Sequence, residues 1–105
     1  MPLKDGTEDA TYLNLLDQHL SELLDKVQPD FIFYQSGVDV LASDKLGRLG
    51  LTIEGCKRRD EKVITAANEN SIPLVASMGG GYSKEIKDIL EAHANTYRVA
   101  QEMFF

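Results

Sequence analysis

Two short apolar runs constrain the fold of this chain more than any other feature. The run from Phe31 to Tyr34 is continuous rather than alternating, as in a strand that is covered on both faces. A second run, from Leu74 to Ser77, is opened by Pro73 and followed by three consecutive glycines. The stretch between the runs has room for a crossover helix. A strand, a crossover helix and a second strand predict a parallel pair with a right-handed connection.

Three helices are predicted around these strands. The first is capped by Thr7 and carries leucines at helical spacing until Pro29 ends it. The second begins after Thr52 as its cap, and the third begins after Ser83 as its cap. The order helix, strand, helix, strand, helix predicts an α/β fold. The predicted inner face of the third helix consists of Ile86, Ile89, Leu90, His93, Tyr97, Ala100 and Phe104.

Composition and charge exclude several classes of function. The 105 residues include 17 acidic and 11 basic side chains, a formal net charge of −6, which argues against a basic surface for nucleic acid. The one dense cationic run, Lys57 to Arg59, is followed by two acids and is predicted to be a solvated helix face. The single cysteine, Cys56, cannot form an internal disulfide and predicts a reducing, cytoplasmic location with a buried, inert thiol. No apolar stretch approaches the roughly 18 to 20 residues that span a bilayer, so no membrane partner is expected.

The predicted sheet is too small to stand alone. Two strands are few for a parallel sheet, which normally lies buried inside a larger one. Either the chain assembles into a homo-oligomer through its exposed sheet edges, or it belongs to a larger domain. We therefore expect residues 1–105 to be an incomplete segment of a domain.

The segments that follow the two strands are the candidate site, because ligands gather at the carboxyl ends of parallel strands. One is Gln35 to Asp39 and the other is Ser77 to Tyr82. In one interpretation, the glycines and the next helix cradle a phosphate, although neither G-x-x-x-x-G-K-[ST] nor G-x-G-x-x-G is present. In the other, the glycines let a substrate reach Tyr82, and Asp39 binds a metal beside it. These features alone leave both open.

The loop from Ala42 to Gly50 contains two glycines and mixed charges and is predicted to be ordered. Two roles fit Asp44 in this loop: contact with the backbone of a substrate, or stabilisation of its own turn. The sequence leaves both open.

Four motifs, in order, resemble the C-terminal third of the histone deacetylase superfamily. They are Pro29 to Asp39, Ser43 to Leu49, Leu51-Thr52-x-x-Gly55, and Gly79 to Tyr82. The resemblance is nearest to the bacterial members and the class IV branch, and it favours the metal interpretation. It implies an arginase-like, three-layer α/β fold and a zinc-dependent hydrolase that removes acetyl groups from acetyl-lysine or a similar amide.

The resemblance also implies roles for single residues. Asp39 matches one of three zinc ligands, at a site where zinc polarises the carbonyl and activates a water. Tyr82 matches the catalytic tyrosine, whose hydroxyl binds the developing oxyanion. Leu46 matches an apolar residue beside the acyl-lysine channel, and Gly80 and Gly81 match a wall of the substrate channel.

Other parts of the family's site have no counterpart in this sequence. The two remaining zinc ligands belong to an Asp-x-His motif and the general base to a His-His pair, whereas His19 and His93 fall inside predicted helices. One carboxylate cannot supply a three-ligand zinc site, so we expect zinc in the complete domain but none in this chain alone. The chain is therefore expected to be the C-terminal portion of a deacetylase whose substrates are acetylated lysine or small acetylated amines. The alternative is a non-catalytic, oligomerising α/β fragment without hydrolase activity.

Overall fold

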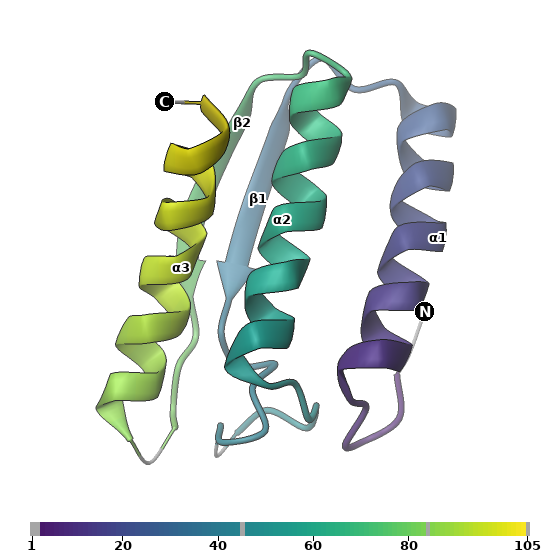
Figure 1. The fold of residues 1–105 in the computed structure, drawn as a ribbon. Helices are drawn as coiled ribbons and strands as arrows, with labels where there is room; N and C mark the ends of the chain where they lie inside the picture. Colours follow the sequence, from purple (N-terminus) through teal and green to yellow (C-terminus); the bar gives the residue numbers. More distant parts are fainter. Residues whose placement is uncertain (1–2, 45, 84, 105) are drawn as a thin grey trace.

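Three helices and two strands alternate along the chain in the predicted order (Figure 1). The structure, a computed structural model, describes residues 3–44, 46–83 and 85–104. The α/β prediction is confirmed. None of the helices described is both long and apolar enough to cross a membrane. The elements are α1 (Asp9–Val27), β1 (Ile32–Gly37), α2 (Ile53–Glu69), β2 (Leu74–Gly79) and α3 (Ile86–Phe104).

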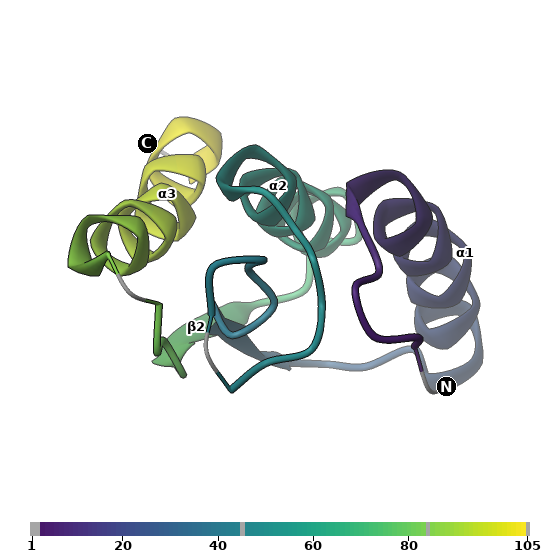
Figure 2. The same ribbon diagram turned by 90° about the horizontal axis from the view of Figure 1, so that it is seen from below.

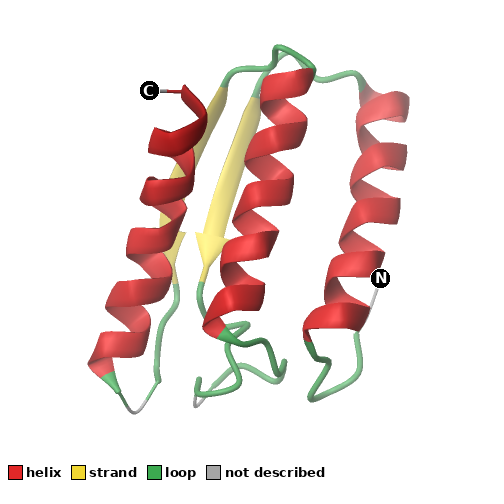
Figure 3. Cartoon of the chain, in the orientation of Figure 1, coloured by secondary structure: helices red, strands yellow, loops and turns green. Residues whose placement is uncertain are grey.

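The two strands form the predicted parallel pair. Their register runs from Ile32 opposite Leu74 to Gly37 opposite Gly79, so the C-terminal ends of both strands lie at the same end of the sheet. The three helices lie side by side on one face of this pair, which gives the described residues two layers (Figures 1 and 2). The loops that follow both strands and the segment before α1 lie at one end of the molecule (Figure 3). The topology thus brings the candidate site segments together.

The face of the strand pair that points away from the helices is exposed and partly apolar. Phe33 is 83% exposed and Val75 is 48% exposed, whereas Ser36, whose side chain is on the opposite face of β1, is buried. Phe31 and Phe33 contact each other on the exposed side, with ring centroids 4.9 Å apart. The continuous apolar run therefore carries apolar side chains toward both faces, of which the described residues cover one.

The N-termini of α1 and α2 lie against each other. Thr52 caps α2 as predicted, since its side chain accepts a hydrogen bond from the Gly55 amide at 2.9 Å. The prediction that Thr7 caps α1 is wrong, because its hydroxyl donates to the Lys4 carbonyl at 2.6 Å and α1 begins at Asp9. The Asp9 carboxylate instead accepts from the Thr52 amide at 2.9 Å, which links the two helix starts.

The charged run of α2 is a solvated face only in part. Arg58 is on the surface, but Arg59 is 4% exposed and Asp60 is completely buried. The spacing explains this, because Asp60 lies four residues after Cys56 and four before Ile64, on the same side of the helix. The predicted solvated face is therefore wrong for Arg59, and Asp60 directly after it is buried as well, whereas the predicted burial of Cys56 is confirmed.

The inner face of α3 also differs from the prediction. Ile86, Leu90 and Tyr97 are at least half exposed, although all three were expected to face inward. Small and polar side chains let α3 pack closely on α2, and Thr96 meets the buried carboxylate of Asp60. The residues of α3 that are buried are Ala92, Asn95, Thr96 and Val99.

Candidate functional site

The segments after β1 and β2 meet at the C-terminal end of the strand pair. Pairing continues beyond β1, since the Val38 amide donates to the Gly79 carbonyl at 3.0 Å. Gly80 follows with φ of +65°, and a Cβ on this residue would lie 3.2 Å from the Cβ of Asp39. Asp39 and Gly80 therefore lie directly against each other. Gly81 has a φ of +119°, and a Cβ on this residue would lie 3.0 Å from the side chain of Ile89 in α3 and 3.2 Å from that of Val38.

Asp39 borders a pocket of about 330 Å³. Its carboxylate is exposed, and Tyr12, Tyr34, Arg59 and Gly80 contribute to the other walls. A larger pocket of about 670 Å³ lies at the start of α1 and contains none of these residues. An accessible carboxylate at the rim of a pocket, on a backbone fixed by strand pairing, is able to bind a cation.

Zinc sites in enzymes use three protein ligands. Within residues 3–44, 46–83 and 85–104, no three His, Cys, Asp or Glu side chains are grouped so that they could share a metal ion. Asp39 supplies one oxygen ligand, so the described residues do not by themselves fit a zinc site. His19 lies 3.8 Å from Glu22 on the surface of α1, and His93 lies on α3; neither lines the pocket beside Asp39.

Tyr82 and Leu46 lie in different loops, and their backbone amides donate hydrogen bonds to the same carboxylate, that of Asp44. The side chains are 56% and 70% exposed, respectively. The Tyr82 amide donates to Oδ1 of Asp44 at 2.6 Å, while the amides of Leu46 and Gly47 donate to Oδ2 at 3.0 and 2.6 Å. Asp44 thus stabilises its own turn, which is one of the two roles that its sequence context left open, and it also reaches the second loop.

Ser83 takes part in the same connection. It forms an isolated antiparallel bridge with Asp44, and its hydroxyl lies 2.8 Å from that of Ser43. The predicted role of Ser83 as the cap of α3 is therefore wrong, and the helix begins later, at Ile86.

The hydrogen bonds to Asp44 determine its ionisation. Burial alone would raise the pKa of this carboxyl group. The amides of Tyr82, Gly47 and Leu46 stabilise the ionised form, and together they lower the pKa below its usual value. Asp44 is consequently an anion at neutral pH.

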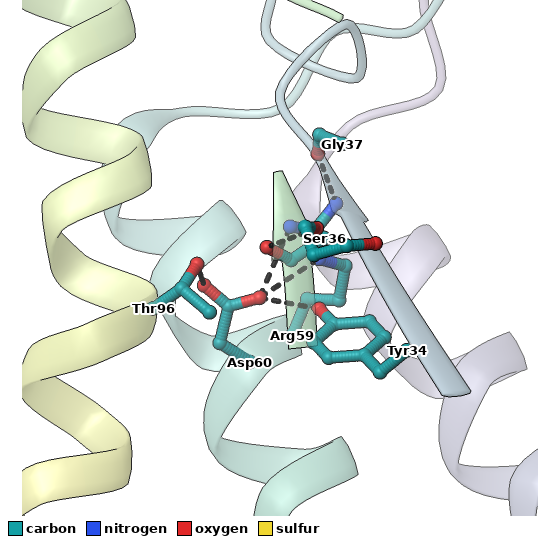
Figure 4. A network of polar contacts seen from close by, with 7 residues as sticks. Tyr34, Ser36, Gly37, Arg59, Asp60 and Thr96 are labelled. Atoms are coloured by element: carbon teal, nitrogen blue, oxygen red, sulfur yellow. Dashed lines mark hydrogen bonds and ion pairs between the residues drawn. The ribbon is translucent and has the colours of Figure 1, made fainter. Parts of the chain in front are cut away.

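A buried polar network supports the end of β1 (Figure 4). Asp60 accepts hydrogen bonds from the hydroxyl of Tyr34, from the hydroxyl of Thr96 at 2.6 Å, and from Nη2 of Arg59 at 3.0 Å. Arg59 in turn donates from Nη1 to the Gly37 carbonyl at 2.5 Å, two residues before Asp39. Sequence reasoning missed this network, although the spacing within α2 places both charged residues on its buried side.

The sequence of this chain is similar to those of known proteins. A model of the histone deacetylase domain matches residues 1–97. A protein of Picosynechococcus is 37% identical over 97% of this chain and 34% of its own length. Histone deacetylase 2 of Arabidopsis thaliana is 42% identical over 75% of this chain and 20% of its length, and histone deacetylase RPD3 of Saccharomyces cerevisiae is 31% identical over 79% and 18%.

The fold agrees as well. The crystal structure of the HDA15 HD domain superposes with a TM-score of 0.71 over 92% of this chain and 27% of that chain, at 20% identity. The chain spans about a third or less of the length of each of these relatives. With the family model covering nearly all of the sequence, this chain belongs to the histone deacetylase domain family.

Proposed function

We propose that this chain forms one side of the active site of a zinc-dependent amide hydrolase that removes acetyl groups from acetyl-lysine or a similar amide. The observation that carries the proposal is the contact between Asp39 and Gly80 at the rim of a pocket, with the loop of Tyr82 bound to the same edge. Membership of the histone deacetylase domain family supports the deacetylase class.

Each site residue has a role in the proposal that suits its surroundings. Asp39 would be one of three zinc ligands, with the other two from outside the described residues. Tyr82 has an exposed side chain, and its hydroxyl would donate a hydrogen bond to the amide oxygen as negative charge develops there. Leu46, also exposed, would contact the aliphatic part of the substrate. Gly80 and Gly81 would leave room for the substrate where a side chain would obstruct it.

The proposal is tested in a chimera in which this chain replaces the matching segment of histone deacetylase 2 of Arabidopsis thaliana. We expect the chimera to release acetate from an acetyl-lysine peptide. Asp39→Ala should remove both the bound zinc and the activity. Tyr82→Phe should reduce the rate about 100-fold while zinc stays bound, the typical effect of losing one oxyanion donor.

Tyr97→Phe is the matched control, because Tyr97 is also about half exposed but lies on α3. Its chimera should keep full activity. Equal losses for Tyr82→Phe and Tyr97→Phe, or full activity and zinc content after Asp39→Ala, would contradict the assigned roles. For the isolated chain, we expect zinc well below one equivalent after dialysis, measured by elemental analysis, since one carboxylate binds zinc weakly.

A second candidate function is assembly without catalysis. It is favoured by the uncovered face of the strand pair, where Phe33 and Val75 are exposed, and by the exposed apolar residues of α3. A second copy covering these surfaces would give a homo-oligomer. Light scattering after size-exclusion chromatography should then give a mass above that of one chain, and a monomer at high concentration would contradict this candidate.

A further inference from the structure

Asp44 connects two loops that are far apart in the sequence. Its Oδ1 accepts from the amide of Tyr82, 38 residues away, and its Oδ2 accepts from the amides of Leu46 and Gly47. Two of these three hydrogen bonds are as short as 2.6 Å, and the residue is 8% exposed. A buried anion that accepts several hydrogen bonds fixes its donors closely, because a donor that moves away leaves the charge poorly solvated.

Gly47 extends this connection to Asp39. A Cβ on Gly47 would overlap the carbonyl oxygen of Asp39 and lie 3.2 Å from Oδ2 of Asp44. The Gly47 backbone is therefore packed between the Asp44 carboxylate and the Asp39 backbone. Through this contact, a displacement of the Asp44 turn would displace Asp39 as well.

A purely local role does not account for these contacts. A carboxylate that only stabilised its own turn would need the amides of Leu46 and Gly47 alone. Asp44 also accepts from Tyr82, and its backbone pairs with Ser83 in an antiparallel bridge. The geometry is that of a clamp between the loop after β1 and the loop after β2.

We propose that Asp44 is the positioning residue of this site: its carboxylate sets Tyr82 in place relative to Leu46 and Asp39 and does not itself contact the substrate. The proposal rests on the function proposed for those three residues. The positioning itself, however, is measurable in this chain without substrate or metal, so each can fail independently of the other.

The test is amide hydrogen exchange in the 105-residue chain by NMR, comparing the wild type with Asp44→Ala. We expect the amides of Tyr82, Leu46 and Gly47 to exchange at least about 10-fold faster in the variant, the effect of losing a hydrogen bond to a charged group. The amides of Ile64 in α2 and Val99 in α3, both fully buried, should remain strongly protected in the variant, because their exchange requires unfolding of the whole chain. Loss of protection at all five positions, or an unchanged rate at Tyr82, would overturn the proposal.

Asp44→Asn gives a second readout with nearly the same shape. The asparagine side chain keeps one acceptor oxygen and replaces the other with a donor. We expect slow exchange to persist on one side of the side chain, either at Tyr82 or at Leu46 and Gly47, and to be lost on the other. Slow exchange on both sides would show that the carboxylate is not needed, and would overturn the proposal.

The controls separate positioning from general stability. Asp25→Asn changes an exposed carboxylate on α1 and should leave all of these exchange rates unchanged. Far-UV circular dichroism reports whether each variant folds. If Asp44→Ala and Asp44→Asn both failed to fold while Asp25→Asn folded, Asp44 would be a determinant of overall stability, and the proposed clamp would be wrong.

Discussion

Among the residues that the structure describes, Asp60 and Asp44 are the two buried aspartates, and they have different kinds of partner. Asp60 accepts hydrogen bonds from the side chains of Tyr34, Arg59 and Thr96, which come from β1, α2 and α3 (Figure 4). The partners that the structure gives Asp44 are backbone amides of two loops. The first arrangement therefore holds α2 and α3 against β1. The second holds two loops that expose the side chains of Leu46 and Tyr82.

The difference has an energetic side. A buried ion pair such as Arg59 with Asp60 gains little net stability, because removing both charges from water offsets their attraction. Removing only one partner of the pair is costly, since the remaining charge is left buried without a partner. A carboxylate held by amides leaves no buried cation behind when it is replaced. We therefore expect substitutions at Asp60 to affect the whole chain and those at Asp44 to affect mainly the loops.

The largest predicted effect is that of Asp60→Ala. It would leave the Arg59 guanidinium, which is 4% exposed, without its carboxylate, at a cost of about 3 to 5 kcal/mol in the free energy of unfolding. Urea denaturation measures this loss. Cys56 gives an independent measurement, because burial raises the pKa of its thiol to about 11 and should make it slow to react with thiol reagents until α2 opens.

Arg58→Ala is the matched control for this experiment. Arg58 is the neighbour of Arg59 and lies 3.6 Å from Glu54, with both side chains largely exposed. Exposed pairs of this kind contribute about 0 to 1 kcal/mol. If Asp60→Ala and Arg58→Ala had equal effects, Asp60 would not be the centre of a buried network, and its contrast with Asp44 would disappear.

Tyr34→Phe tests a single hydrogen bond of the same network. Burial raises the pKa of Tyr34, so its hydroxyl stays protonated and donates to Asp60. Loss of a hydrogen bond to a charged group should lower the free energy of unfolding by about 1.5 to 3 kcal/mol. Tyr97→Phe, on an exposed part of α3, should lower it by less than about 0.5 kcal/mol. Similar losses for the two variants would argue against the network.

The contrast also explains what could be predicted from the sequence. The order of elements follows from local patterns, as do the cap at Thr52 and the meeting of the two Gly-containing loops. Burial of Asp60 was also readable, since it repeats the spacing of Cys56 and Ile64. The adjacent run of positive charges instead predicts a solvated face.

The partners of Asp44 could not be read in the same way. Backbone amides are present at every position, so no pattern of residue types indicates which of them meet one carboxylate. The predicted inner face of α3 is wrong for a related reason. The helix carries apolar residues on two sides, and the large ones, such as Leu90 and Tyr97, are exposed in the described residues. Periodicity identifies an apolar side but not the element that covers it.

The pH dependence of stability should separate the two carboxylates further. The folded-state pKa of Asp44 is lowered, so its ionised form stabilises the fold above the unfolded pKa of about 3.9, and this contribution is lost as the pH falls through the folded pKa. At pH 7, Asp44→Asn should cost about 1 to 2 kcal/mol. Below about pH 4, the difference from the wild type in urea denaturation should shrink. A difference that stayed constant down to pH 2 would contradict a charge-based clamp.

The smallest effect should come from Ser43→Ala, which removes another side-chain link between the same two loops. The hydroxyls of Ser43 and Ser83 lie 2.8 Å apart, but Ser43 is exposed, so water can replace the lost partner of Ser83. The pair is also neutral. We expect a loss of about 0.5 kcal/mol by urea denaturation, independent of pH between 2 and 7. If this loss exceeded that of Asp44→Asn at pH 7, the serine pair would be the main connection between the loops. Asp44 would then not hold the loops as Asp60 holds α2 and α3 against β1.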